Sequence, residues 1–134
     1  MPDWRNIGPH RYRCEQGFLH WEPHGQVLLD HAEEFLRVVD GLGARTQQVL
    51  CLFDQRDAIP IHPDARKRYM RYVREARPHV TIVFVVTSLM VRTVNHLGIT
   101  GARLLANYDL RHQSFDNLDD ALVCIGRLRA CPKP

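Results

Sequence analysis

The alternation of apolar and polar residues divides the chain into short strands and amphipathic helices. Strands are predicted at residues 11–16, 18–22, 47–54, 79–86 and 111–115. The first two flank Gly17, as in a β-hairpin. The strands at 47–54 and 79–86 are apolar on both faces, which indicates that helices cover them on each side.

Helices are predicted at residues 29–42, 64–77, 88–97 and 116–128. Gly41 and Gly43 are expected to end the first helix. Pro78 ends the second, because proline disfavours a helical conformation in the residue before it. Gly98 is expected to close the third, and the segment 99–110 fits a short helix or an irregular connection.

Strands and helices therefore alternate after the opening hairpin. This order predicts an α/β fold, namely a single mixed, mainly parallel sheet opened by a β-hairpin with helices packed on it. No linker divides the 134 residues, so we expect one domain over 1–134 with its core at about 10–129. The strand at 11–16 is a candidate exposed edge that pairs with a second copy of the chain, so a homodimer is one expectation.

Composition restricts the class of protein. A hydrophobic content of 45% and a charged content of 25% are typical of a globular domain. No apolar run is long enough to span a bilayer, and the first residues lack the apolar region of a signal peptide, so a cytoplasmic protein is expected. A net charge of +3 is too small to indicate nucleic-acid binding. The four cysteines form no CxxC pair and are expected to be buried or free thiols.

Binding sites in parallel sheets collect in the loops that leave the carboxyl ends of strands. Asp54 ends a strand here, where a phospho-accepting receiver domain keeps its aspartate. That chemistry also needs a cluster of acids and a lysine after a later strand, and neither is present. We expect Asp54 instead to accept backbone hydrogen bonds in its turn.

His62 is a candidate general base, with Asp57 or Asp64 to orient it. No serine or threonine lies between Gln47 and Arg77, so the loop lacks a nucleophile of that kind. Catalysis, such as hydrolysis by His62, is an alternative hypothesis, and the primary expectation is that the protein is not an enzyme.

The eight histidines raise the question of a metal site. His20, His24 and His31 are closest to a cluster, but no HxH or HExxH pattern pairs them. His20 is as consistent with packing as with metal ligation. We therefore predict no metal site and no cofactor.

The predicted helix 64–77 is strongly basic. Its cationic residues are Arg66, Lys67, Arg68, Arg71, Arg74 and Arg77. Apolar residues recur on the helix at three- and four-residue spacing, so the basic residues occupy most of the remaining circumference. Such a face is either simply solvated or meets an acidic partner electrostatically.

Three segments together resemble a known family. A strand ending in "LFD" is followed by the helix "HPDARKRYMRYV", and the chain closes with "FDNLDDALVCI". With the opening hairpin and the β/α order, these segments resemble the STAS/SpoIIAA-like family, which includes anti-sigma-factor antagonists and cytoplasmic domains of sulfate transporters. The resemblance covers roughly residues 10–129 and rests on order and pattern.

The resemblance implies a small, bacterial-type, non-enzymatic signalling module that binds a protein partner. Antagonists of the family are switched by phosphorylation of a serine at the start of the helix, but the corresponding "AIPIHPDAR" here has no hydroxyl residue. Standalone members also resemble lipid-binding SEC14-type domains, which implies a carrier of a small apolar or anionic ligand as the alternative.

We therefore expect the loop after the central strand and the basic helix to bind a protein partner, such as an acidic surface or a signalling protein. The predicted contact residues are Asp54, Gln55, Arg56, Asp57, His62, Asp64, Lys67, Arg71, Arg74 and Ser88. In the carrier alternative, a small ligand lies between the sheet and the third helix, near Ser88, Met90 and His96.

Overall fold

The computed structural model describes residues 3–15, 17–46, 49–76, 80–106 and 111–130. The strands are β1 (Arg5–Ile7), β2 (His10–Glu15), β3 (Phe18–Glu22), β4 (Val49–Asp54), β5 (Val80–Val85) and β6 (Arg111–Phe115). The helices are α1 (Leu29–Thr46), α2 (Pro63–Ala76), α3 (Leu89–Ala106) and α4 (Leu118–Ala130). No helix in these ranges has both the length and the apolar character needed to cross a bilayer.

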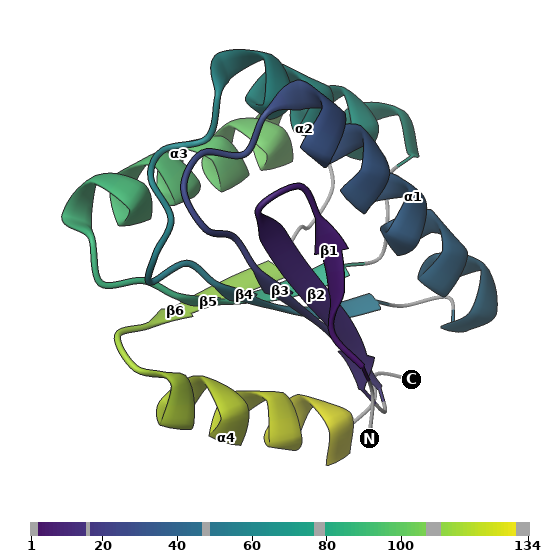
Figure 1. Ribbon diagram of the computed structural model, residues 1–134, viewed down its shortest axis with the longest axis vertical. Coiled ribbons are helices and arrows are strands. Elements are labelled where there is room, and N and C mark those ends of the chain that lie inside the picture. The colour runs from purple at the N-terminus through teal and green to yellow at the C-terminus, as the bar shows by residue number, and fades with distance from the viewer. Residues whose placement is uncertain (1–2, 16, 47–48, 77–79, 107–110, 131–134) are drawn as a thin grey trace.

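The strands lie side by side in the order β1-β2-β3-β4-β5-β6. β1, β2 and β3 pair antiparallel, and β3 through β6 pair parallel. Each parallel strand therefore lies beside the one that precedes it in the chain. Because connections between parallel strands are right-handed almost without exception, the connecting helices lie on the same face of the sheet. Figure 1 shows α1, α2 and α3 on one face of the sheet and α4 on the other. The predicted mixed, mainly parallel α/β sheet is confirmed.

Alternate residues of the central strands supply two cores. Leu52 of β4 and Val83 of β5 pack with Ile125 of α4. On the other face, Cys51 of β4 packs with Phe35 of α1. Since successive side chains of a strand point to opposite faces, the doubly apolar strands are covered on both sides, as predicted.

The opening of the chain contains a strand that the apolar pattern did not predict. β1 pairs with β2 through Arg5 and Tyr12, Asn6 and Arg11, and Ile7 and His10. β1 pairs with this strand only at residues 10–12, so the expectation that 11–16 is an exposed edge is wrong for Arg11 and Tyr12. β1 has only three residues and only Ile7 is buried, which is too short for a visible alternation. The turn at Gly17 has φ of 85°, which suits the predicted hairpin.

Two helices continue past the glycines that were expected to end them. α1 runs through Gly41 and Gly43 to Thr46, and α3 runs through Gly98 to Ala106. A glycine inside a helix costs only about 1 kcal/mol relative to alanine. Ile99, buried against the sheet, anchors the continuation of α3. The segment 99–106 is thus helical, and 107–110 lies outside the described residues.

Two of the cysteines are buried, as expected for small apolar residues. Cys51 lies in the core between the sheet and α1, and Cys124 lies in the core between the sheet and α4. Burial raises the pKa of the Cys51 thiol to about 12, so this thiol stays protonated at neutral pH. Cys14 is exposed, and Cys131 lies outside the described residues.

Candidate functional site

Asp54 ends β4 in a tightly held turn. Its carboxylate is buried, with the residue 2% exposed, and it accepts two hydrogen bonds from Arg56, from Nε at 2.8 Å and from Nη2 at 2.7 Å. The backbone N–H of Arg56 also donates to Oδ1 at 3.4 Å, which confirms the predicted turn hydrogen bond. Burial raises the pKa of Asp54, but the hydrogen bonds and charge of Arg56 outweigh this effect and hold the pKa below its ordinary value. The carboxylate is therefore ionised and paired.

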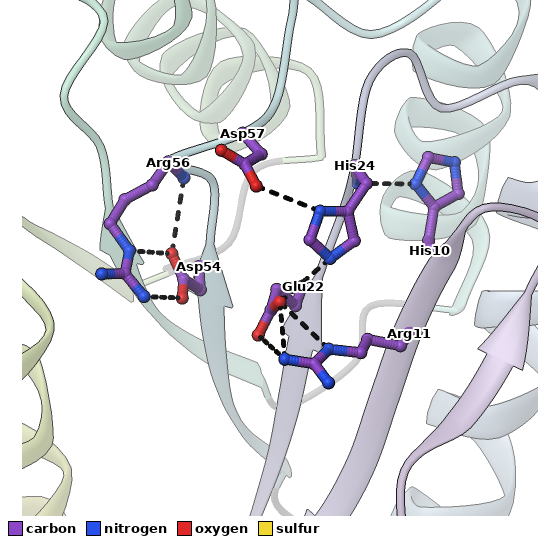
Figure 2. Close-up of polar contacts among 7 residues, drawn as sticks. All are labelled: His10, Arg11, Glu22, His24, Asp54, Arg56 and Asp57. Atoms are coloured by element: carbon purple, nitrogen blue, oxygen red, sulfur yellow. Dashed lines mark hydrogen bonds and ion pairs between the residues drawn. The ribbon is translucent and has the colours of Figure 1, made fainter.

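A second set of polar contacts ties this turn to the hairpin. Figure 2 shows Glu22 between Arg11 and His24. The Nη2 atom of Arg11 lies 3.0 Å from Glu22 Oε1, and His24 Nε2 lies 2.9 Å from the same oxygen. His24 Nδ1 lies 3.2 Å from an oxygen of Asp57. The chain of contacts from Arg11 to Asp57 thus holds the predicted loop against β2 and β3.

His10 anchors the other side of this network. Its Nδ1 accepts a hydrogen bond from the backbone N–H of His24 at 3.0 Å, and its Nε2 lies 3.1 Å from Nδ1 of His31. His31 Nδ1 also accepts from the N–H of Leu28, so the proton between the two rings belongs to His10. Burial, followed by the charges of His31 and His24, lowers the pKa of His10 to about 4. His10 is therefore neutral and fully engaged at neutral pH.

His20 lies on the same face of β3 as Glu22. It is 3% exposed, and none of the described residues offers a hydrogen bond to either of its ring nitrogens. Single ligand atoms of His20, Glu22 and Asp54 all lie within 4.8 Å of one another. Glu22, Asp54, Arg56 and Asp57 line a hollow that opens to solvent above these residues.

No local sequence motif indicates this group. Metal-site motifs such as HxH pair residues close together in the chain, whereas His20 and Glu22 come from β3 and Asp54 comes from β4. The two carboxylates meet because the parallel register places Trp21 beside Phe53, and hence Glu22 beside Asp54. The sequence held one indication of this group. His20 and Glu22 lie on the same face of one predicted strand, and Asp54 ends the next predicted strand. Of these residues, only Asp54 was predicted as a site residue.

Gln55 and Ser88, two of the predicted contact residues, have structural partners. The N–H of Gln55 donates to the carbonyl of Val85 at 2.9 Å, and its side chain accepts from Asn95. Ser88 Oγ accepts from the N–H of Val91 at 3.3 Å and so caps the start of α3. Gln55 thus joins the loop to β5 and α3, whereas the contact of Ser88 stays within the start of α3.

His62 and Asp64 lie where the loop enters α2. The backbone N–H of Asp64 donates to His62 Nδ1 at 3.1 Å, and the N–H of Arg66 donates to the His62 carbonyl at 3.0 Å. The Asp64 carboxylate lies 3.9 Å from His62 Nδ1, beyond hydrogen-bond distance. His62 Nδ1 thus accepts a hydrogen bond from a backbone N–H in the first turn of α2, which has no partner within the helix.

The basic residues of α2 differ in their surroundings. Arg66 is exposed and lines the apolar cavity between α2 and the sheet. Arg68 is half-buried and its Nε lies 3.1 Å from Glu33 Oε1. Lys67, Arg71 and Arg74 are exposed, and within the described residues no carboxylate pairs with them. These three side chains, which we call the α2 basic face, leave positive charge in solvent along the length of α2. Arg77 lies outside the described residues.

A cavity of about 180 Å³ lies between α1, α2, α3 and the sheet. Most of its lining is apolar, including Phe35, Phe53 and Phe84, and Gln55 and Asn95 are among its few polar groups. The carrier alternative had placed its ligand near Ser88, Met90 and His96. None of these three lines the cavity, because α3 turns Val94, Asn95, Gly98 and Ile99 toward the sheet instead.

Comparisons with known proteins identify the fold. No protein-family model matches the sequence, and no curated protein is significantly similar to it. A solved structure, an uncharacterized protein from the DUF3478 family with a SpoIIAA-like fold from Shewanella loihica PV-4, matches over 92% of this chain and 91% of that chain. The TM-score is 0.59 and the sequence identity is 10%, so the likeness concerns the fold alone. The chain has a SpoIIAA-like fold.

Proposed function

We propose that the protein is a non-enzymatic binding module that recognises a protein partner through residues 54–64 and the α2 basic face. The carrying observation is that Lys67, Arg71 and Arg74 leave unneutralised positive charge on α2, the helix that the loop after the central strand enters. A SpoIIAA-like fold is consistent with a regulatory or interaction role.

The contacts of the loop support this proposal. Arg56 is bound to Asp54, and Asp57 to His24, so the loop is ordered before any partner arrives. A preordered surface loses little conformational entropy on binding, which favours affinity. Unpaired positive charge then selects an acidic partner and accelerates its association.

The arrangement around His62 supports a role in binding over catalysis. Nδ1 of His62 accepts the N–H of Asp64, so this nitrogen is not available to be oriented by a carboxylate. The segment from Gln47 to Arg77 also holds no serine or threonine nucleophile.

Charge reversal on α2 tests the proposal. Arg71→Glu with Arg74→Glu is expected to weaken capture of the partner about tenfold or more, since it turns attraction into repulsion. Immobilised protein is used to capture partners from a host-cell lysate at low and high salt, followed by quantitative mass spectrometry. The matched control, Arg5→Glu with Arg127→Glu, makes the same change of charge on β1 and α4 and should leave capture unchanged. Equal loss in both variants, or no loss in either, contradicts the assignment of the surface.

The cavity favours a second candidate function, the binding of a small apolar molecule. Apolar side chains from three helices and two strands surround it, and Gln55 and Asn95 offer polar groups that orient a ligand. Gln55 follows Asp54 directly, so a ligand in the cavity would lie beside the loop that we assign to partner binding.

Filling the cavity tests this second function. Native mass spectrometry of freshly purified protein is expected to show a co-purifying small-molecule mass, and Val94→Phe is expected to abolish it because the larger ring occupies the space. Val123→Phe, on the exposed side of α4, is the matched control and should retain the ligand. A clean apo mass for the unmodified protein, or an unchanged ligand mass in Val94→Phe, rejects the carrier function.

A further inference from the structure

We propose that His20, Glu22 and Asp54 form a binding site for a divalent transition-metal ion, for which Zn²⁺ is the representative. The site lies at the carboxyl ends of β3 and β4, on the face of the sheet that α4 covers. It shares Asp54 with the loop 54–64 that we assign to partner binding, but it uses neither the α2 basic face nor the lining of the apolar cavity.

The state of His20 is the first argument. Its ring is buried between Trp4, with ring centroids 5.1 Å apart, and Phe18, at 6.4 Å. Within the described residues, neither ring nitrogen has a hydrogen-bond partner. A buried polar group without a partner is destabilising and is rare in native proteins, so it points to a missing ion or ligand.

The geometry is the second argument. The ligand atoms of the three residues lie within 4.8 Å of one another. Oxygen and nitrogen ligands bind zinc at about 2.0 to 2.2 Å, which separates two ligands of one ion by about 3 to 3.5 Å. The site therefore needs a contraction of at most about 1 to 2 Å, which rotation of the Glu22 and Asp54 side chains can supply. The hollow lined by Glu22 and Asp54 gives the ion an entrance and leaves room for water to complete its coordination.

The charged residues around the site determine the affinity that we expect for the metal ion. Arg11 pairs with Glu22 and Arg56 pairs with Asp54, and their side chains are 43% and 47% exposed. Each guanidinium can therefore yield one carboxylate oxygen to a metal and remain solvated. Arg13 is paired with Glu15, and His24 also contacts Glu22. These cations compete with the metal, so we expect moderate affinity that increases when Arg56 is removed.

The donor set determines the class of metal. One imidazole nitrogen with two carboxylate oxygens suits zinc and its transition-metal neighbours, since imidazole is a poor ligand for Mg²⁺ and Ca²⁺. We therefore expect magnesium to compete weakly for the site.

Isothermal titration of metal-free protein with zinc chloride at neutral pH is the test. One ion per chain is expected, with affinity at least about tenfold weaker in His20→Asn and in Glu22→Gln. Arg56→Gln is expected to bind several times more tightly, which a merely structural cluster would not do. His62→Ala removes a partly exposed histidine outside the proposed site and serves as the control for adventitious zinc binding.

A second readout uses Co²⁺ in place of zinc. Cobalt bound by nitrogen and oxygen ligands is expected to give visible absorption bands that are lost in Glu22→Gln. This variant decides the outcome if His20→Asn fails to fold, as checked by circular dichroism. Absence of binding at about 1 mM zinc, or binding undiminished in the folded variants, overturns the proposal.

Discussion

Leu52→Ala is expected to lower the free energy of unfolding by about 2 to 5 kcal/mol. Leu52 is fully buried in the middle of β4, where it packs with Val83, Val85 and Ile125 between the sheet and α4. Truncation removes the apolar contacts of the side chain and leaves a space that the close-packed strands cannot fill. A loss of this size is a large part of the stability of an ordinary domain.

Leu104→Ala removes the same atoms from a side chain that is 78% exposed on α3. Its effect is expected to stay within about 0.5 kcal/mol. Urea unfolding curves followed by circular dichroism measure both variants against the unmodified chain. Similar losses in the two variants would contradict the burial of Leu52 between β4 and α4.

Acid is expected to destabilise the fold well above the pH at which carboxylates titrate. The pKa of His10 is about 4 in the folded protein, against 6.5 for an ordinary histidine. Because the folded state resists protonation, the stability from His10 is complete above pH 6.5 and is lost as pH falls toward 4. The loss is at most about 1.4 kcal/mol per pH unit and about 3 kcal/mol in total. His20 and His112, whose pKa values are also lowered by burial, act in the same direction.

His10→Gln separates this contribution from the others. Glutamine cannot titrate, but its side-chain oxygen can still accept the N–H of His24, which His10 accepts at 3.0 Å. The variant is therefore expected to show a shallower dependence of the free energy of unfolding on pH between 6.5 and 4. Urea unfolding at several pH values gives both slopes. Parallel slopes would mean that His10 does not carry the acid sensitivity.

The structure places three features on different surfaces, so their tests do not overlap. Asp54 turns toward the hollow on the α4 side of the sheet, whereas Gln55 lines the cavity on the other side. The α2 basic face of Lys67, Arg71 and Arg74 lines neither the hollow nor the cavity. Charge reversal on α2, filling of the cavity at Val94 and removal of Glu22 therefore each address one proposal.

Much of the fold followed from local patterns. Residues 49–54 and 80–85 are strands because β-branched and apolar residues run through them, and the period of α2 and α4 is visible in their apolar positions. The position of Asp54 at the end of a strand was also predictable. These features depend on residues close together in the chain, whose side-chain directions are fixed by the period of the element.

The remaining features depended on which elements become neighbours. β1 is a strand only because β2 offers it an edge, and α1 and α3 pass through glycines because packing offsets the local cost. Arg56 pairs with Asp54 two residues away, yet Glu22 and His20 reach Asp54 only through the register of β3 on β4. By itself, the sequence determined the alternation of strands and helices and the loop that follows the central strand. Only the tertiary structure decided what meets that loop, because contacts across a sheet are set by strand order and register, which local periodicity does not encode.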